Sequence, residues 1–253
     1  MKFDTYIPCD ILKPYIRILA ISESEVASDY KVLPGTELVI GFQYKGQLSY
    51  RDGEKKIPLA SSGLTGLMDQ FRVFSHAAEI GSVLVFFKEG KAASFFREPI
   101  HELFRESVSL DHFMLRSELL ILEERLQASK TDAEKIRLVE QFLISKMNST
   151  LPDLMVASAI SMIYKSKGNI RIKELLSELH VSQSVLEKKF RQVVGASPKK
   201  FASIVRFKNT IHSYDRNRSL TDLGYEAGFY DQAHFIREFK HFTGDSPEIF
   251  FGK

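Results

Sequence analysis

The chain has 253 residues with 35 Lys and Arg, 32 Asp and Glu, a formal net charge of +3 at pH 7 and one cysteine. This length is sufficient for two domains, each with its own core. The single Cys9 excludes an intramolecular disulfide and a cysteine-based zinc site, which suits a reducing compartment.

The first 22 residues and the hydropathy of the whole chain indicate where the protein is located. Pro, Asp, Lys and Arg interrupt each apolar run of residues 1–22, so the segment lacks the apolar core of a signal peptide. No stretch approaches the ~20 apolar residues that span a bilayer. We therefore expect a soluble, cytoplasmic protein without a membrane partner.

Charge is distributed unevenly along the chain. From Leu154 onward there are 16 Lys and Arg against 10 Asp and Glu, a net charge of +6, whereas the preceding residues have 19 against 22, a net charge of −3. A basic second half suits a nucleic-acid module, although many domains that bind neutral ligands carry a similar charge.

Strands are expected from about Tyr30 to Phe87. Short β-branched and aromatic runs are separated there by Gly, Asp and Pro, which is the spacing of strands and hairpins in a sheet or barrel. These runs are ELVIGFQY, QLSYRDGEKKI, QFRVFSH and GSVLVFF. Helical patterns return after Lys91, with AASFF and then IHELF. The phenylalanines of the strands favour core packing, with an apolar pocket as the alternative; they are Phe42, Phe71, Phe74, Phe86 and Phe87.

The first half lacks the motifs of an enzyme. Its strand region contains one histidine, His76, whereas a metal site in a β-barrel needs several converging ligands. His101-Glu102 lacks the second histidine of H-E-x-x-H, and neither G-x-S-x-G nor a glycine-rich phosphate loop occurs. We expect no catalytic residue, no metal and no cofactor. His76 is interpreted as a solvated or hydrogen-bonded structural residue, with a place in an effector pocket as the alternative.

A helical hairpin is expected over about residues 112–148. Its first helix has a leucine stripe, and Thr131 with Glu134 forms a capping box that opens the second. The two stripes pack either on the protein's own strands or in a dimer seam; they are Leu115, Leu119, Leu122 and Leu126, then Ile136, Val139, Leu143 and Met147. The polar segment Asn148–Leu154 (NSTLPDL) predicts a domain joint, with domains at 1–150 and 151–253.

Two copies of one motif follow. GASPKKF at 195–201 returns as GDSPEIF at 244–250, and in each copy Gly ends one helix while Ser and Pro begin another. This offset of 49 pairs six identical residues: Gln183/Gln232, Phe190/Phe239, Gly195/Gly244, Ser197/Ser246, Pro198/Pro247 and Phe201/Phe250. Upstream the offset is 48, which places one added residue near Gly228. The repeat predicts similar units at about 172–194 and 220–243.

Each unit is predicted to be a short helix, a turn and a longer helix. Ser182 and Asp231 stand at the N-cap positions of the longer helices. The apolar residues of these helices follow i, i+4, i+7; they are Leu186, Phe190 and Val193, then Phe235, Phe239 and Phe242. A helix pair whose second member has a basic outer face is the helix-turn-helix pattern. A helix from Pro198 to about Tyr214 joins the two units.

These motifs are the basis of a family resemblance. They are Ser182, Leu186, Phe190, Gly195, Ser197-Pro198 and Arg206, then Gly228-Phe229, Phe235, Phe239-Lys240, Gly244 and Ser246-Pro247. The last hundred residues resemble the DNA-binding domain of the AraC/XylS family of bacterial transcription regulators. Gly224 and Arg171 depart from its pattern, which usually has Ala and a capping Ser or Thr there. The second copy keeps that cap as Ser219, with Asp222 three residues later.

The order of elements in the first half is similar to the cupin-like sensor domains of the same family. The resemblance thus implies an α+β two-domain fold. A β-rich, cupin-like barrel with a helical hairpin precedes an all-α domain of two helix-turn-helix units joined by a spacer helix.

The resemblance also implies which residues face DNA. Recognition helices present their outer faces to base edges in the major groove. Arg237 is the strongest candidate, because a guanidinium can bind guanine O6 and N7 together. The base-facing candidates are Gln183, Ser184, Glu187, Lys188, Arg191, Gln232, Ala233, His234, Ile236 and Arg237. The phosphate candidates are Lys189, Lys199, Lys200, Arg206 and Lys240.

The function implied is a sequence-specific, double-stranded-DNA-binding transcription regulator that responds to a small effector in its first domain. Family members commonly activate, which would make RNA polymerase a partner, and commonly form homodimers; repression is the alternative mode. The sequence leaves the effector-binding residues unknown. The competing hypothesis is a cupin-like ligand-binding or catalytic protein whose C-terminal helical units make protein contacts. Affinity for duplex DNA that falls steeply with salt distinguishes the two.

Overall fold

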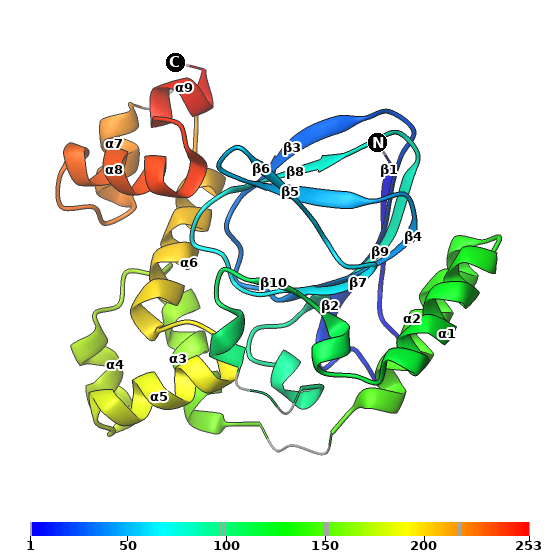
Figure 1. The fold of residues 1–253 in the computed structure, drawn as a ribbon. Coiled ribbons are helices and arrows are strands. Elements are labelled where there is room, and N and C mark those ends of the chain that lie inside the picture. Colours follow the sequence, from blue (N-terminus) through cyan, green and yellow to red (C-terminus); the bar gives the residue numbers. More distant parts are fainter. Residues whose placement is uncertain (1, 97, 99, 149–151, 217–218, 253) are drawn as a thin grey trace.

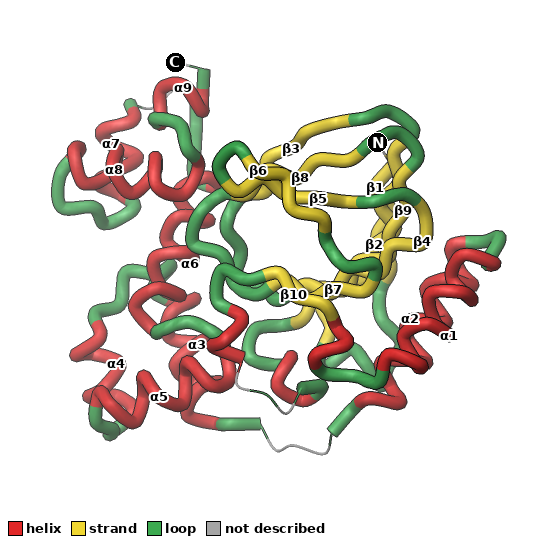
Figure 2. Tube along the Cα trace, in the orientation of Figure 1, coloured by secondary structure: helices red, strands yellow, loops and turns green. Residues whose placement is uncertain are grey.

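The structure, a computed structural model, describes residues 2–96, 98, 100–148, 152–216 and 219–252. Its strands form two antiparallel sheets that face one another in the first half of the chain (Figures 1 and 2). The six-stranded sheet has the order β1 (Lys2–Tyr6), β2 (Ile16–Ser24), β9 (Ile80–Phe87), β4 (Val39–Lys45), β7 (Ser62–Thr65) and β10 (Ser107–Ser109). The four-stranded sheet has the order β3 (Ser28–Val32), β8 (Arg72–His76), β5 (Leu48–Asp52) and β6 (Lys55–Pro58).

Three strands lie outside the range predicted from the sequence, namely β1, β2 and β10. β2 is central, paired on one side with β1 and on the other with β9. Ile16, Leu19, Ala20 and Ile21 are all buried. A strand buried on both faces has no alternation of polar and apolar residues to reveal it. The segments AASFF and IHELF form the short 3₁₀ turns Ala92–Ser94 and Ile100–Leu103.

The predicted hairpin is formed by α1 (Arg116–Ala128) and α2 (Asp132–Lys146). Its capping box is confirmed: Thr131 Oγ1 accepts from Glu134 N–H, and the Glu134 carboxylate accepts from Thr131 N–H. Both apolar stripes pack on the six-stranded sheet, which confirms the first of the two interpretations. The buried members are Leu119, Leu122, Leu126, Ile136, Val139 and Leu143. Leu115, at the N-cap of α1, is 68% exposed.

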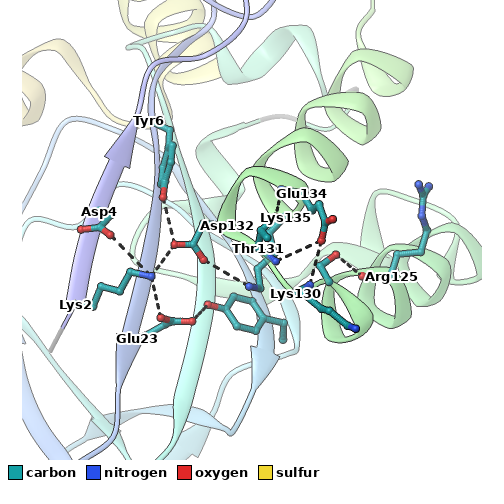
Figure 3. Close-up of polar contacts among 12 residues, drawn as sticks. Lys2, Asp4, Tyr6, Glu23, Arg125, Lys130, Thr131, Asp132, Glu134 and Lys135 are labelled. Carbon is teal, nitrogen blue, oxygen red and sulfur yellow. Dashed lines mark hydrogen bonds and ion pairs between the residues drawn. The ribbon is translucent and has the colours of Figure 1, made fainter.

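An ion-pair cluster fastens β1 to this hairpin (Figure 3). Lys2 Nζ lies 2.6 Å from Asp132 Oδ2 and 3.1 Å from Glu23 Oε2, and Tyr6 Oη donates to Asp132 Oδ2 at 3.3 Å. Tyr44 Oη donates to Glu23 at 2.6 Å. Hydrogen bonds to Asp132 and Glu23 raise the pKa of Lys2, and the bond from Lys2 lowers the pKa of Asp132. The edge strand is therefore fixed to the helix that covers the sheet.

The second half is helical, and both predicted units and the helix that joins them are confirmed, whereas α3 was not predicted from the sequence. The helices are α3 (Leu154–Lys165), α4 (Ile172–Leu179), α5 (Gln183–Val194), α6 (Pro198–His212), α7 (Leu220–Glu226), α8 (Gln232–Thr243) and α9 (Pro247–Phe251). The helix α6 ends two residues before the predicted Tyr214. Figure 1 shows α3–α5 at one end of α6 and α7–α9 at the other. The α+β class, with a β-rich half and hairpin before an all-helical half, is confirmed.

Two apolar clusters fill the molecule. The larger begins in the sheets, includes the hairpin and continues through α3, α4 and α5 to Val205 of α6. The smaller joins the second helix-turn-helix unit to α6, and Leu33 of the β-rich half packs against it; its buried members are Ile204, Phe207, Leu223, Phe229, Phe235, Phe239 and Phe242. The predicted boundary at 150/151 thus cuts across the larger cluster and stays a prediction. Residues 149–151 of the predicted joint lie outside the described residues.

Candidate nucleic-acid interface and ligand pocket

The first candidate recognition helix is α5. Ser182 is its N-cap residue, but the hydroxyl lies 3.2 Å from Ser184 Oγ rather than accepting a backbone N–H. Leu186, Phe190 and Val194 point inward and are fully buried. Val194, rather than the predicted Val193, completes the buried stripe. A helix has 3.6 residues per turn, so a residue four positions after Phe190 lies on the same face as well as one three positions after it does.

The outer face of α5 carries the polar residues predicted from the repeat. Gln183, Ser184, Lys188 and Arg191 are exposed and Glu187 is half-buried. Gln183 Nε2 donates to Glu187 Oε1 at 2.9 Å along the helix surface. This bond uses one N–H of Gln183 and one oxygen of Glu187, so each side chain keeps further hydrogen-bonding atoms.

The second candidate recognition helix is α8. Asp231 caps it by accepting from His234 N–H at 2.6 Å, and Phe235, Phe239 and Phe242 form its buried stripe. Exposed on the other side are Gln232, Ala233 and Arg237, whereas His234 and Ile236 are half-buried. The His234 ring packs on Phe229 at 5.4 Å between centroids. This face offers one guanidinium amid small or apolar side chains.

The phosphate candidates fall into two groups. Lys189, Lys199 and Lys240 are exposed, and Lys189 Nζ forms an ion pair at 3.0 Å with Asp153, the N-cap of α3. Lys200 and Arg206 instead contact protein carboxylates.

Arg206 ties α6 to α8. Its Nη2 donates to Glu238 Oε2 at 2.6 Å, and Cζ lies 4.5 Å from the centre of the Phe229 ring. The side chain is only 19% exposed. Its role in the structure is to orient the second recognition helix, so its contact with phosphate stays a prediction. The ion pair of Lys200 is described below.

One exposed aromatic residue in this region was absent from the sequence-based candidates. Tyr230 lies in the turn before α8 and is 88% exposed. Its position just before the Asp231 cap could have indicated it, because the preceding Phe229 already fills the apolar position of this turn.

A cavity of about 480 Å³ lies between the two sheets. Phe74 and Phe86 line it, as the alternative interpretation of the strand phenylalanines predicted. Phe42 and Phe87 are instead core residues with no exposure. Lys208 of α6 also lines the cavity, so the helix that joins the two units forms part of its wall.

Three charged residues line this mostly apolar space, namely Glu37, Arg72 and Lys208. Glu37 accepts from Arg17 Nη2 at 2.8 Å. Arg72 donates from Nη1 to Ser107 Oγ and from Nη2 to the Arg105 carbonyl, both at 2.7 Å. Burial lowers the pKa of Arg72. Among the described residues no carboxylate pairs with Lys208, which leaves its ammonium as the cation available in the wall.

His76 lies outside this cavity. It is 4% exposed, and its Nδ1 is 2.8 Å from the Ala77 carbonyl oxygen, which confirms a hydrogen-bonded structural residue. Within the described ranges, no three His, Cys, Asp or Glu side chains are grouped as metal ligands. None of the described helices is both long and apolar enough to cross a membrane.

Comparison with known proteins identifies the helical half. Residues 175–252, which hold both units and α6, match the family model described as a helix-turn-helix domain. This segment is an AraC-type helix-turn-helix domain. The residues that the sequence singled out on α5 and α8 lie within the matched segment, and their contact with DNA stays a prediction.

Similar proteins include the Msm operon regulatory protein of Streptococcus mutans, 24% identical over 153 residues, which are 59% of this chain. The match spans 55% of that regulator's length. ToxT from Vibrio cholerae covers 100% of this chain and 98% of its own, at 14% identity and a TM-score of 0.49. The AraC-like transcriptional activator CuxR covers 87% of this chain and 89% of its own, at 10% identity and a TM-score of 0.31.

Proposed function

We propose that this protein is a transcription regulator that reads a specific DNA sequence with α5 and α8 and responds to a small molecule held between its sheets. The observation that carries the proposal is the pair of helix-turn-helix units on one chain, each with a buried aromatic or aliphatic stripe and an exposed polar face. Both faces suit a major groove about 12 Å wide. A regulator of this kind acts in the cytoplasm.

The two units are assigned different reading chemistry. The face of α5 offers Ser184, Glu187 and Lys188 for hydrogen bonds to base edges. The face of α8 offers Arg237 for a guanine, with Ala233 and Ile236 limited to apolar contact such as a thymine methyl group. The 15 residues of α6 give about 22 Å at 1.5 Å per residue. With the width of the flanking units, this suits successive turns of a duplex ~34 Å apart.

The first test is duplex binding by the full chain. Phosphate contacts release counterions, so affinity for a mixed-sequence duplex should fall steeply between 50 and 200 mM salt. Sequencing genomic fragments retained at moderate salt then identifies the preferred site. If the chain binds no duplex at low salt, the helical units make protein contacts and the competing hypothesis is correct.

We assign the cavity to an apolar effector that carries an acidic group. Its walls are mostly apolar, and Lys208 and Arg72 present positive charge to it. An acid seated there would touch α6 directly, which gives ligand binding a route to both units. The test compares a medium-chain carboxylic acid with the matched alcohol by calorimetry, for the natural chain and for Lys208→Gln. Preference for the acid that disappears in Lys208→Gln supports the assignment, and equal binding of acid and alcohol contradicts it.

We also propose a homodimer formed through the outer face of α1, and activation through contact with RNA polymerase. Support for the dimer is apolar exposure on that helix: Leu115 is 68% exposed, Leu120 42% and Ile121 57%. Leu120 and Ile121 lie on the side of the helix opposite to the buried Leu119 and Leu122, whereas Leu115 precedes the helix as its N-cap residue. Solution mass at tens of micromolar tests the dimer, and transcription from the selected site tests the mode of control.

A further inference from the structure

Asp69 lies in the loop between β7 and β8, and its carboxylate has no solvent exposure. Four nitrogen atoms from three side chains approach the carboxylate. Arg105 donates to it from Nε and, at 2.8 Å, from Nη2; Lys200 Nζ lies at 2.7 Å and His241 Nε2 at 3.6 Å. Burial alone would raise the pKa of Asp69, but the hydrogen bonds from Arg105 and Lys200 outweigh it and lower the pKa to about 2.

These partners come from separate parts of the chain. Arg105 belongs to the β-rich half. Lys200 is in the first turn of α6, directly after the first unit, and His241 is in the last turn of α8. One carboxylate of the β-rich half therefore contacts the spacer helix and the second recognition helix together.

A second set of contacts holds the same end of α8. Lys31 of β3 donates to the Thr243 carbonyl at 2.8 Å and to Asp245 Oδ2 at 2.6 Å, where a cation also offsets the partial negative charge of a helix end. Phe71 packs on Gly244, where a Cβ would lie 2.6 Å from the ring. The loop from β7 to β8 and the strand β3 thus hold the second unit from one side.

The two units differ in how they join the β-rich half. The first shares the large apolar cluster with it, and Gly195 lies against Ile100. The second has its own apolar cluster, against which Leu33 of the β-rich half packs, and its polar contacts with that half include the Lys31–Asp245 ion pair and the approach of His241 to Asp69. Ion pairs can be exchanged for contacts with water or phosphate at far lower cost than a shared core can be separated.

We propose that Asp69 is an electrostatic latch that holds the start of α6 and the end of α8 against the β-rich half and opens when DNA phosphate takes Lys200 from it. The inference rests on the proposed DNA binding and specifies how that binding is restrained. One ammonium group cannot pair closely with Asp69 and with a phosphate at the same time. Asp69 and DNA phosphate therefore compete for Lys200.

The geometry allows the latch to open without leaving a buried charge unpaired. Arg105 binds the carboxylate through two nitrogens and keeps doing so when Lys200 leaves, and its side chain is already 47% exposed. Gly66 makes this arrangement possible, because a Cβ there would lie 1.8 Å from the Leu103 carbonyl oxygen. The loop that carries Asp69 and the segment that carries Arg105 therefore stay together in either state.

The test compares Asp69→Asn with Asp29→Asn in the full chain. Each variant removes one negative charge, and the partner of Asp29 is Arg51 of β5 rather than Lys200 or His241. Affinity for a 30-base-pair mixed-sequence duplex is measured by fluorescence anisotropy between 50 and 200 mM salt. Because the natural chain must release Lys200 from Asp69 before a phosphate can take it, Asp69→Asn should bind the duplex about fivefold more tightly than Asp29→Asn, at an equal salt slope, since Lys200 contacts phosphate in both complexes.

The double variant Asp69→Asn with Lys200→Ala should lose this gain in affinity, and its salt slope should be about 0.9 shallower than that of the natural chain, because the phosphate contact of Lys200 is gone. If Asp69→Asn and Asp29→Asn have the same slope and affinity while the natural chain binds duplex in a salt-dependent way, the latch is wrong and the proposed function stands. If no variant binds duplex at any salt, both are wrong.

A measurement on the natural chain keeps the test decisive should Asp69→Asn fail to fold. Hydrogen exchange of the segment 66–71 is followed with and without the same duplex at 50 mM salt. Faster exchange in the complex is expected, because the loop loses its contacts with α6 and α8. Unchanged or slower exchange overturns the latch.

Discussion

Arg237 and Lys240 lie on the exposed side of α8, three residues apart, and their positions along the helix assign them different partners. Arg237 follows the cap by six residues, near enough to the helix start to enter the groove. Lys240 lies almost one turn further on, where the helix leaves the bases and passes the backbone. Two cations of similar charge therefore have separable effects.

We predict that Arg237→Ala relaxes sequence choice whereas Lys240→Ala weakens binding to every sequence. Losing a bidentate guanine contact costs about 1–3 kcal/mol at one base pair, and losing a phosphate contact lowers the salt slope by about one. Titrations against the preferred site and single-base variants at several salt concentrations measure both. A uniform loss of affinity in Arg237→Ala would make Arg237 a phosphate anchor and assign base reading chiefly to α5.

Asp69 also makes a prediction about stability and pH. Its folded pKa of about 2 is below the ordinary value of about 3.9, so its stabilising effect is complete above the ordinary value and is lost as pH falls toward 2. The difference in unfolding free energy between the natural chain and Asp69→Asn should therefore shrink by about 1 kcal/mol from pH 6 to pH 3. Urea titrations at both pH values measure it, and a difference that stays constant contradicts the assigned charge.

At the scale of elements, α1 has two sets of apolar residues, one buried and one exposed. Leu119, Leu122 and Leu126 are buried on the six-stranded sheet, whereas Leu120 and Ile121 are exposed. An amphipathic helix normally exposes polar residues on its outer side, so the apolar outer pair requires a reason beyond the fold.

Substitutions on the two faces should give opposite outcomes. Leu119→Ala should cost about 2–5 kcal/mol of stability because it leaves a cavity in the core. The pair Leu120→Gln and Ile121→Gln should leave stability within about 0.5 kcal/mol but convert the proposed dimer to a monomer. Denaturation and solution mass are measured on both variants. A natural chain that is already monomeric at tens of micromolar would remove the proposed role of this face.

At the scale of the whole molecule, apolar packing divides the chain differently from the order of its motifs. The first unit is continuous with the β-rich half, and the second unit has a core of its own. Such separate cores are expected to unfold as separate cooperative units.

Phe239→Ala should therefore destabilise the second unit by about 3–5 kcal/mol and leave the first unit folded. Hydrogen exchange resolved along the sequence should show faster exchange over α7 and α8 while α3 and α5 keep their protection. Equal acceleration throughout the helical half would show that both units unfold as one.

The helical half could be predicted because its signals are local. Caps such as Asp231 and Thr131, and apolar stripes such as Phe235 and Phe239, lie within a few residues of the structure they specify. The cavity and the latch could not be predicted in this way. Asp69 and Lys200 are 131 positions apart, and no sequence period relates a loop carboxylate to a helix that begins in another domain. The positive charge of Lys200 was evident from the sequence, but its pairing with Asp69 was not.

The continuous core has a practical consequence for building chimeric regulators. A fusion that exchanges sensing modules at the predicted joint near residue 150 would separate α3 and α5 from the side chains they pack against, and would expose apolar surface on both pieces. A junction inside α6 just before Ile204 would instead keep every buried residue of the smaller cluster on one piece and would remove only Val205 from the larger one. The part of this chain that can be transplanted is therefore the second unit, whereas the first unit must stay with the β-rich half.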